Sequence, residues 1–139
     1  MNCPESNKNI YVYGSTIFKY LIKNAKDKQL KEALIDSLMN MYDQRISLFG
    51  QEGYVMGLKG SDMLKYQPNK LEEAFILLKK SVEIQGKKSR ATDLNSYFKA
   101  ATEKFEAGTF VTSDVIEVYS TVADYIDYNI NNKEGKKQK

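Results

Sequence analysis

The chain has 139 residues, 42% of them hydrophobic, which is enough for one domain with its own core. It contains no histidine, and this removes the commonest general base, the commonest transition-metal ligand and the usual pH switch. Its one cysteine, Cys3, excludes an internal disulfide and a cysteine zinc site. We therefore expect no enzymatic activity, no metal and no cofactor.

The net charge of +3 comes from the end of the chain. The segment 133–139 holds four lysines and one glutamate, so the remainder is neutral, and we expect this polar tail to be disordered. Nineteen of the 21 basic residues are lysine, whereas base and phosphate recognition favours the forked guanidinium of arginine. Nucleic-acid binding is therefore not expected. Membrane insertion is not expected either, because no apolar run approaches the roughly 20 residues of a spanning helix.

Six segments carry apolar residues at helical spacing, and none alternates with period two for long enough to predict a strand. The first, 10–24, has an apolar stripe. Its members are Ile10, Tyr13, Ile17, Tyr20 and Leu21. The second begins after Asp27, a favourable N-cap residue, and its apolar pattern stops at Gly50.

The third and fourth helices are separated by a proline. The third covers 54–66 and contains two glycines, each of which costs a helix about 0.8 to 1 kcal/mol relative to alanine, so neighbours must support it. After Pro68, the spacing of Asn69 and Glu72 predicts a capping pair that opens the fourth helix. That helix ends at Gly86.

The last two helices complete an all-α chain. The fifth is marked by apolar residues over 94–105 and closes at Gly108. The sixth begins with Thr112 or Ser113 as its cap and runs to about Ile130.

A self-similarity in three parts runs through these helices at a spacing of 41 residues. Its copies are Leu30, Glu32, Ala33 and Leu34, then Leu71, Glu73, Ala74 and Phe75, then, more faintly, Thr112, Asp114, Val115 and Ile116. Tyr13 and Tyr54 are separated by the same interval. A fixed period of roughly 20 to 50 residues is the signature of stacked repeats.

We therefore expect a single domain over 1–132 that stacks three antiparallel helix pairs. The pairs lie at about 9–50, 53–86 and 89–132. Two helices approach closely where glycine or alanine leaves a notch and a bulky residue of the partner helix fills it. Gly60 and Ala74 are the candidate notches.

The middle pair places large and small residues in a specific order. Its first helix offers Met56 and then Gly60, and its second offers Ala74, then Leu78, then Ser81. This order resembles that of the tetratricopeptide-repeat (TPR) proteins, although the spacing is 41 residues here and about 34 in that family. The resemblance implies a divergent TPR-like α-α superhelix.

The chain as a whole is similar to bacterial proteins described as TPR-like, many of which are exported and have no known activity. In that group the stretch 2–4 looks internal. We therefore expect Met1 to begin a truncated domain that has lost a leader sequence, and the parent protein to be periplasmic or extracellular.

The resemblance also implies a function as a protein-interaction or scaffold module, which binds a segment of a partner protein in the groove formed by the first helix of each pair. Tyrosine is enriched at recognition surfaces because it offers a large contact area with a polar tip. The expected groove residues are Tyr13, Tyr20, Tyr54, Ser61, Asn95 and Thr102. Ordinary packing in a half-buried core is the alternative for the tyrosines.

A carrier for a small apolar ligand is the alternative function, because flexible methionines suit irregular cavities. The lining would be Met39, Met41, Met56 and Met63.

The glycines between positions 50 and 60 lack the Gly-Lys-Ser or Gly-Lys-Thr ending of a phosphate loop, so they predict close packing. Asp124 and Asp127 share a helix face, and without a histidine or a facing acidic pair this predicts a solvated face and no metal site.

Overall fold

The computed structural model of the chain describes residues 8–137, with side chains described as far as Asn132. This part of the chain is all-α, as the sequence predicts, and contains no strand. Its helices are α1 (Asn9–Asn24), α2 (Lys28–Phe49), α3 (Glu52–Tyr66), α4 (Leu71–Gln85), α5 (Ala91–Glu106) and α6 (Thr112–Lys137). Cys3 and the expected truncation at Met1 lie outside the described residues.

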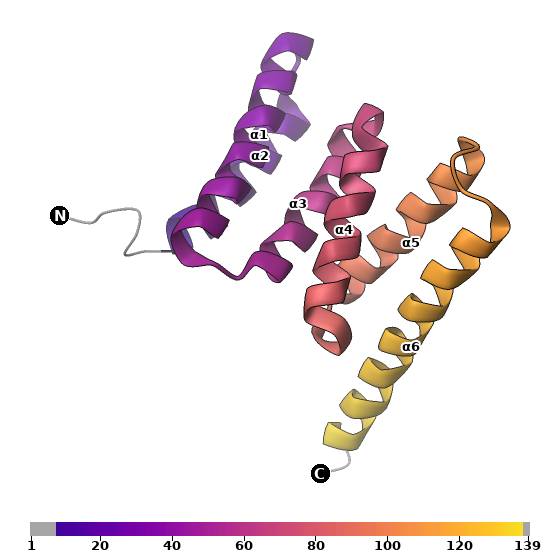
Figure 1. The fold of residues 1–139 in the computed structure, drawn as a ribbon. Helices are drawn as coiled ribbons and strands as arrows, with labels where there is room; N and C mark the ends of the chain where they lie inside the picture. The colour runs from indigo at the N-terminus through magenta and orange to yellow at the C-terminus, as the bar shows by residue number, and fades with distance from the viewer. Residues whose placement is uncertain (1–7, 138–139) are drawn as a thin grey trace.

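The helices form an open series with α1 and α2 at one end and α6 at the other (Figure 1). Each helix packs on the next one in the chain, and α3 also packs on α5. The contact between α3 and α4 is the most extensive. The terminal helices have the least cover, because α1 packs mainly on α2, and α6 mainly on α5 and the turn Gly86–Lys88.

Helix ends follow the sequence signals in most places. The Asp27 carboxylate accepts a hydrogen bond from the backbone N–H two residues on, as an N-cap does. Gly50 and Gly86 end α2 and α4 with φ of 72° and 54°, a region that favours glycine. Asn69 makes no cap, because the 3-10 turn Pro68–Lys70 precedes α4 and takes it out of the capping position. At the other end, α6 runs to Lys137 and so through most of the segment expected to be disordered.

The expected notch at Gly60 is confirmed, and α3 carries a second one. A Cβ added at Gly60 would lie 2.8 Å from Leu78 Cγ on α4. At Gly57 an added Cβ would overlap the Asp93 carboxylate and lie 2.7 Å from the Ser81 hydroxyl oxygen. Gly57 and Gly60, two of the three glycines of α3, weaken it as an isolated helix but allow α4 and α5 to approach its backbone.

The sequence stripe of α1 does not point into the core. The helix packs on α2 through Tyr11, Phe18 and Ile22, and the Tyr11 ring lies 5.7 Å from that of Phe49. Apolar residues occupy both sides of α1, and the side that packs is the one where Gly14 leaves room for Met41 of α2. All five stripe residues are exposed to solvent.

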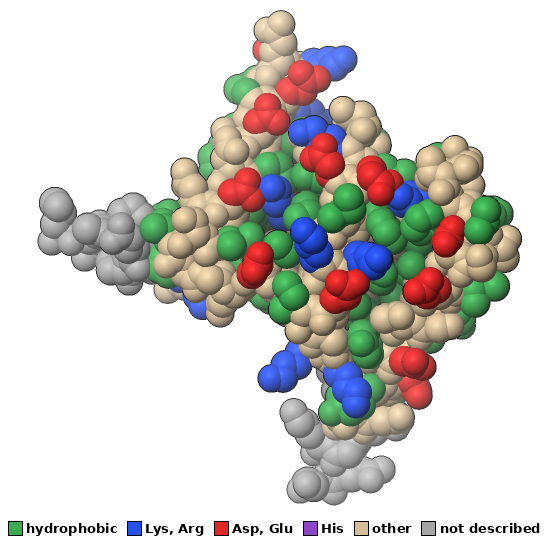
Figure 2. All heavy atoms as spheres, viewed as in Figure 1, with side chains coloured by type: hydrophobic (Ala, Val, Ile, Leu, Met, Phe, Trp, Pro, Cys, Tyr) green, Lys and Arg blue, Asp and Glu red, His purple; other side chains and the backbone are tan. Residues whose placement is uncertain are grey.

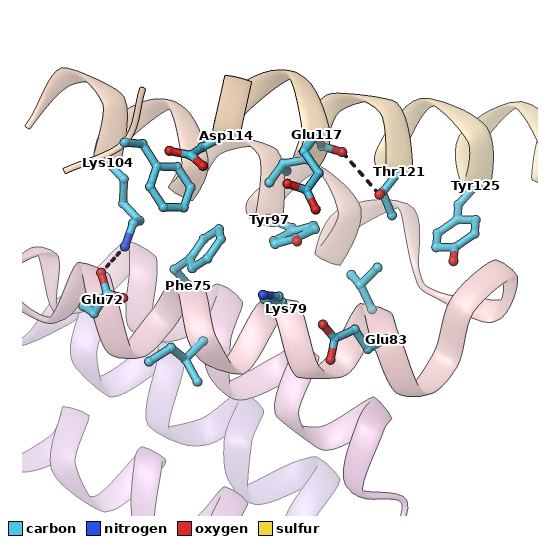
Figure 3. Close-up of a pocket in the computed structure, with 14 residues that line it drawn as sticks. Glu72, Phe75, Lys79, Glu83, Tyr97, Lys104, Asp114, Glu117, Thr121 and Tyr125 are labelled. Carbon is cyan, nitrogen blue, oxygen red and sulfur yellow. Dashed lines mark hydrogen bonds and ion pairs between the residues drawn. The ribbon is translucent and has the colours of Figure 1, made fainter. Parts of the chain in front are cut away.

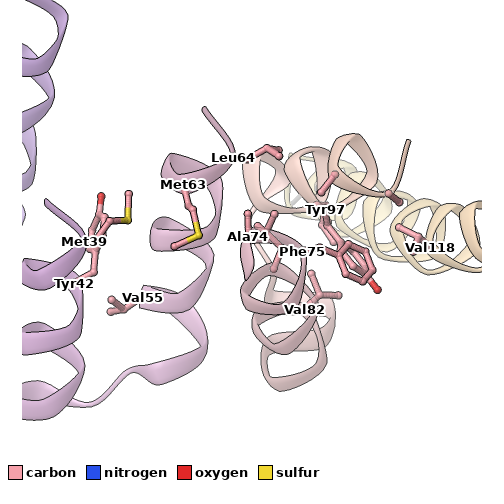
Figure 4. Packing of buried hydrophobic residues seen from close by; sticks show 14 of the residues in the cluster. Met39, Tyr42, Val55, Met63, Leu64, Ala74, Phe75, Val82, Tyr97 and Val118 are labelled. Carbon is pink, nitrogen blue, oxygen red and sulfur yellow. The ribbon is translucent and has the colours of Figure 1, made fainter. Parts of the chain in front are cut away.

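The hydrophobic core runs from α2 through α3, α4 and α5 to α6 (Figure 4). Met39 and Met63 are buried in it, between α2 and α3, and Val118 reaches it from α6. The three copies of the 41-residue pattern differ in burial. Ala74 of the middle copy is fully buried, whereas Ala33 of the first copy is exposed.

Candidate partner-binding groove

The residues predicted for the groove lie on three helices, in four different surroundings. Tyr13 and Tyr20 are 68% and 66% exposed on α1. Tyr54 and Ser61 lie half-buried on α3, within a polar network described below. Asn95 is exposed on α5, where it borders a hollow between α5 and α6. The sixth residue, the half-buried Thr102, donates a hydrogen bond to the backbone of its own helix.

Tyr54 lies between two arginines. Arg45 comes from α2 and Arg90 from the residue before α5, and each guanidinium carbon is 5.5 Å from the centre of the tyrosine ring. Such contacts attract a cation to the face of the ring. These are the only arginines in a chain of 19 lysines, so both planar cations are used at one tyrosine.

Arg90 is held in place by a buried carboxylate. Its Nε and Nη2 donate to the two oxygens of Asp93 at 3.0 and 2.6 Å, and the Ser61 hydroxyl donates to the same carboxylate at 3.0 Å. Asp93 is fully buried. Burial opposes the charge of Arg90, but the hydrogen bonds and charge of Asp93 outweigh it and raise the pKa of the guanidinium.

Arg45 differs from Arg90 in that no carboxylate of the described residues forms an ion pair with it. Its side chain is 5% exposed, and among the described residues its Nε has no hydrogen-bond partner. Buried donors in folded proteins are nearly always paired. The network around Tyr54 therefore holds a buried guanidinium nitrogen that has no hydrogen-bond acceptor among the described residues.

A second set of polar contacts joins α1 and α2 to α3. The Tyr42 hydroxyl donates to Asp62 at 2.5 Å, and the Lys19 ammonium lies 3.3 Å from the same carboxylate. Burial, together with the charge of Asp62, raises the pKa of Tyr42 far above its ordinary value. Lys19 is thus the residue of α1 that reaches across to α3.

Lys19 also borders a cationic groove where the C-terminal ends of α1 and α3 meet the start of α2. The hollow has a volume of about 540 Å³. It is lined by Lys19, Tyr20, Ile22, Lys23, Lys31, Lys65 and Tyr66. Four lysines and two tyrosines therefore surround it, and none of the residues that line it is acidic. We call this hollow the lysine groove.

A groove between α4 and α6 has the opposite charge (Figure 3). Its volume is about 510 Å³, and Phe75 and Tyr97 form its floor. The charged residues that line it are Glu72, Lys79, Glu83, Lys104, Asp114 and Glu117. Lys104 is paired with Glu72, so carboxylates remain in excess. In Figure 2 both red and blue groups lie over α4, whereas those over α6 are red.

The proposed methionine cavity does not lie in one place. Met39 and Met63 border a hollow of about 330 Å³ whose other lining residues are polar or charged, and Met41 packs on Gly14 of α1. Within residues 8–132, no three acidic side chains gather as they would around a metal ion. In the same part of the chain no helix combines the length and apolar character needed to span a bilayer.

Sequence reasoning missed both arginines. A signal was present, since two arginines among 19 lysines mark positions where a flat cation is required.

No protein-family model, no curated protein and no solved structure is significantly similar to this chain.

Proposed function

We propose that the chain is a protein-interaction or scaffold module that binds an acidic segment of a partner protein. Its helices would form a TPR-like superhelix of three antiparallel pairs, and the segment would lie along the first helices α1, α3 and α5. Support for the pairing comes from the notch at Gly60, filled by Leu78, and from the contact between α3 and α5.

The observation that carries the proposal is the lysine groove. Four lysines line it, of which Lys19 is paired with Asp62 outside the lining, and Tyr20 and Tyr66 supply aromatic surface beside them. An acidic segment would find charge attraction and apolar contact in the same place. Lys19 is also paired with Asp62, so the groove adjoins the polar contacts that join α1 and α2 to α3.

Fluorescence anisotropy with a labelled peptide of alternating glutamate and leucine tests this proposal. The triple variant K19E/K23E/K65E should weaken binding about tenfold or more, because it reverses the charge of the groove. The triple variant K80E/K88E/K99E makes the same change in net charge at exposed lysines elsewhere and should bind almost as the wild type does.

A peptide of alternating lysine and leucine should not bind the groove. Equal loss of binding in the two triple variants would show that net charge alone is responsible and would overturn the assignment. Tighter binding of single-stranded DNA than of the acidic peptide, lost in the groove variant, would replace a protein partner with a nucleic acid.

A further inference from the structure

The outer face of α1 is apolar and uncovered. Its five residues are the sequence stripe at 10, 13, 17, 20 and 21, and the exposed fraction of Ile17 is 58%. With 3.6 residues per turn, this stripe points away from the side on which Tyr11 and Ile22 contact α2 and Lys19 reaches α3. It therefore faces the outer end of the helix series.

In the helices that have a preceding neighbour, the side that faces this neighbour is buried. On α3, Val55 is fully buried and turned toward α2 (Figure 4). On α5, the Tyr97 ring lies 5.4 Å from that of Phe75 on α4. The positions that correspond to the stripe at the 41-residue spacing are half-buried or exposed on α3 and α5, and on α5 they are all polar, so an exposed apolar stripe at these positions is peculiar to α1.

The other end of the series carries a matching hollow between α5 and α6. Its volume is about 590 Å³, and most of its lining is apolar. The residues that line it are Asn95, Phe98, Tyr119, Val122, Ala123, Asp124, Ile126, Asp127 and Ile130. We call it the end groove. Ile116, 57% exposed, extends the same apolar side of α6.

The two ends also carry opposite charges. The segment 8–26, which contains α1, has four lysines and no acidic residue. The segment 112–132 of α6 has four acidic residues and no basic one, and Asp124 and Asp127 line the end groove itself. Electrostatic attraction between these opposite charges draws the two ends together and orients them before contact.

We propose that α1 of one copy docks in the end groove of a second copy of this chain. The apolar stripe would cover the apolar lining, and the lysine-rich end would meet the acidic one. Such a contact joins unlike surfaces, so each added copy leaves one free end of each kind and the assembly grows as an open row. Short repeat stacks require caps or partners for their end faces, and further copies of the chain joined in this way would cover these faces.

Complementary variants test this geometry in analytical ultracentrifugation. The wild-type protein should show a mass that rises with concentration beyond the 15.9 kDa of one copy. The head variant Y13N/I17N and the tail variant Y119N/I130N replace exposed residues, so both should remain folded by circular dichroism. Each alone should stay a monomer, because each lacks one side of the contact.

A mixture of the two variants retains one intact head and one intact tail, so it should form dimers and nothing larger. A wild-type protein that stays monomeric at every concentration would overturn the proposal. Self-association of the wild type without dimers in the mixture would also overturn it, because the contact would then be symmetric or elsewhere.

Discussion

Helices α1 and α3 stand at corresponding places in the 41-residue pattern, yet they differ in almost every respect of packing. Tyr13 and Tyr54 are counterparts in the sequence. Tyr13 is 68% exposed, whereas Tyr54 is held between two guanidinium groups. The difference arises because α3 has helices on several sides and α1 packs mainly on α2. Position within the series therefore decides burial more than the local pattern does.

Removal of the buried carboxylate of Asp93 should cause the largest loss of stability among the changes that compare the centre of the helix series with its surface. The D93A variant leaves Arg90 and Ser61 without their acceptor, and it should lower the free energy of unfolding by about 3–5 kcal/mol. D36A removes an exposed carboxylate from α2 and should change it by less than about 0.5 kcal/mol. Urea denaturation measures both. Similar losses of unfolding free energy in the two variants would show that the buried Asp93 network stabilises the protein no more than an exposed carboxylate does.

Two glycine substitutions compare the same helices more closely. G57A forces a methyl group against Asp93 and Ser81 and should cost about 1–3 kcal/mol. G14A meets only the flexible side chain of Met41 and gains up to about 1 kcal/mol in helix propensity, so it should be close to neutral. Thermal unfolding of the two variants gives the comparison. A G14A loss as large as that of G57A would show that α1 is packed as tightly as α3.

Alkaline pH should weaken the centre of the helix series through Tyr97. Burial, followed by the charges of Glu83 and Glu117, raises the pKa of Tyr97 from 10.0 to about 12. Between these values the unfolded chain binds fewer protons than the folded one, so this contribution to stability is complete below pH 10 and is lost as the pH rises toward 12.

The Y97F variant should therefore flatten part of the alkaline decline and leave stability near neutral pH almost unchanged, because the ring contact with Phe75 is kept. Denaturant titrations at several pH values measure the slope. An unchanged slope in Y97F would show that the decline has another source, such as Tyr42.

The fold class and most of the helix bounds could be predicted because they depend on local signals, although Asn69 makes no cap and α6 extends beyond Ile130 to Lys137. Apolar spacing marked each helix, and Asp27, Gly50 and Gly86 marked three of the ends. The notch at Gly60 was also predictable, since a glycine inside a helix requires a neighbour close to its backbone.

The candidate site was harder to predict from the sequence because it depends on contacts between residues that are distant in the chain. Arg45 lies on α2 and Arg90 just before α5, and they meet only once α3 has placed Tyr54 between them. The side of α1 that packs could not be chosen either, because apolar residues lie on both sides. The deciding feature was the space left by Gly14 opposite Met41, which only the packed structure reveals.

Chemical-shift mapping by NMR tests the central claim, that the lysine groove receives an acidic segment. During titration with the glutamate-leucine peptide, the backbone signals of Tyr20, Lys23, Lys65 and Tyr66 should move most, and K19E/K23E/K65E should abolish these shifts. Shifts confined to the groove between α4 and α6, around Phe75, Thr121 and Tyr125, would contradict the account.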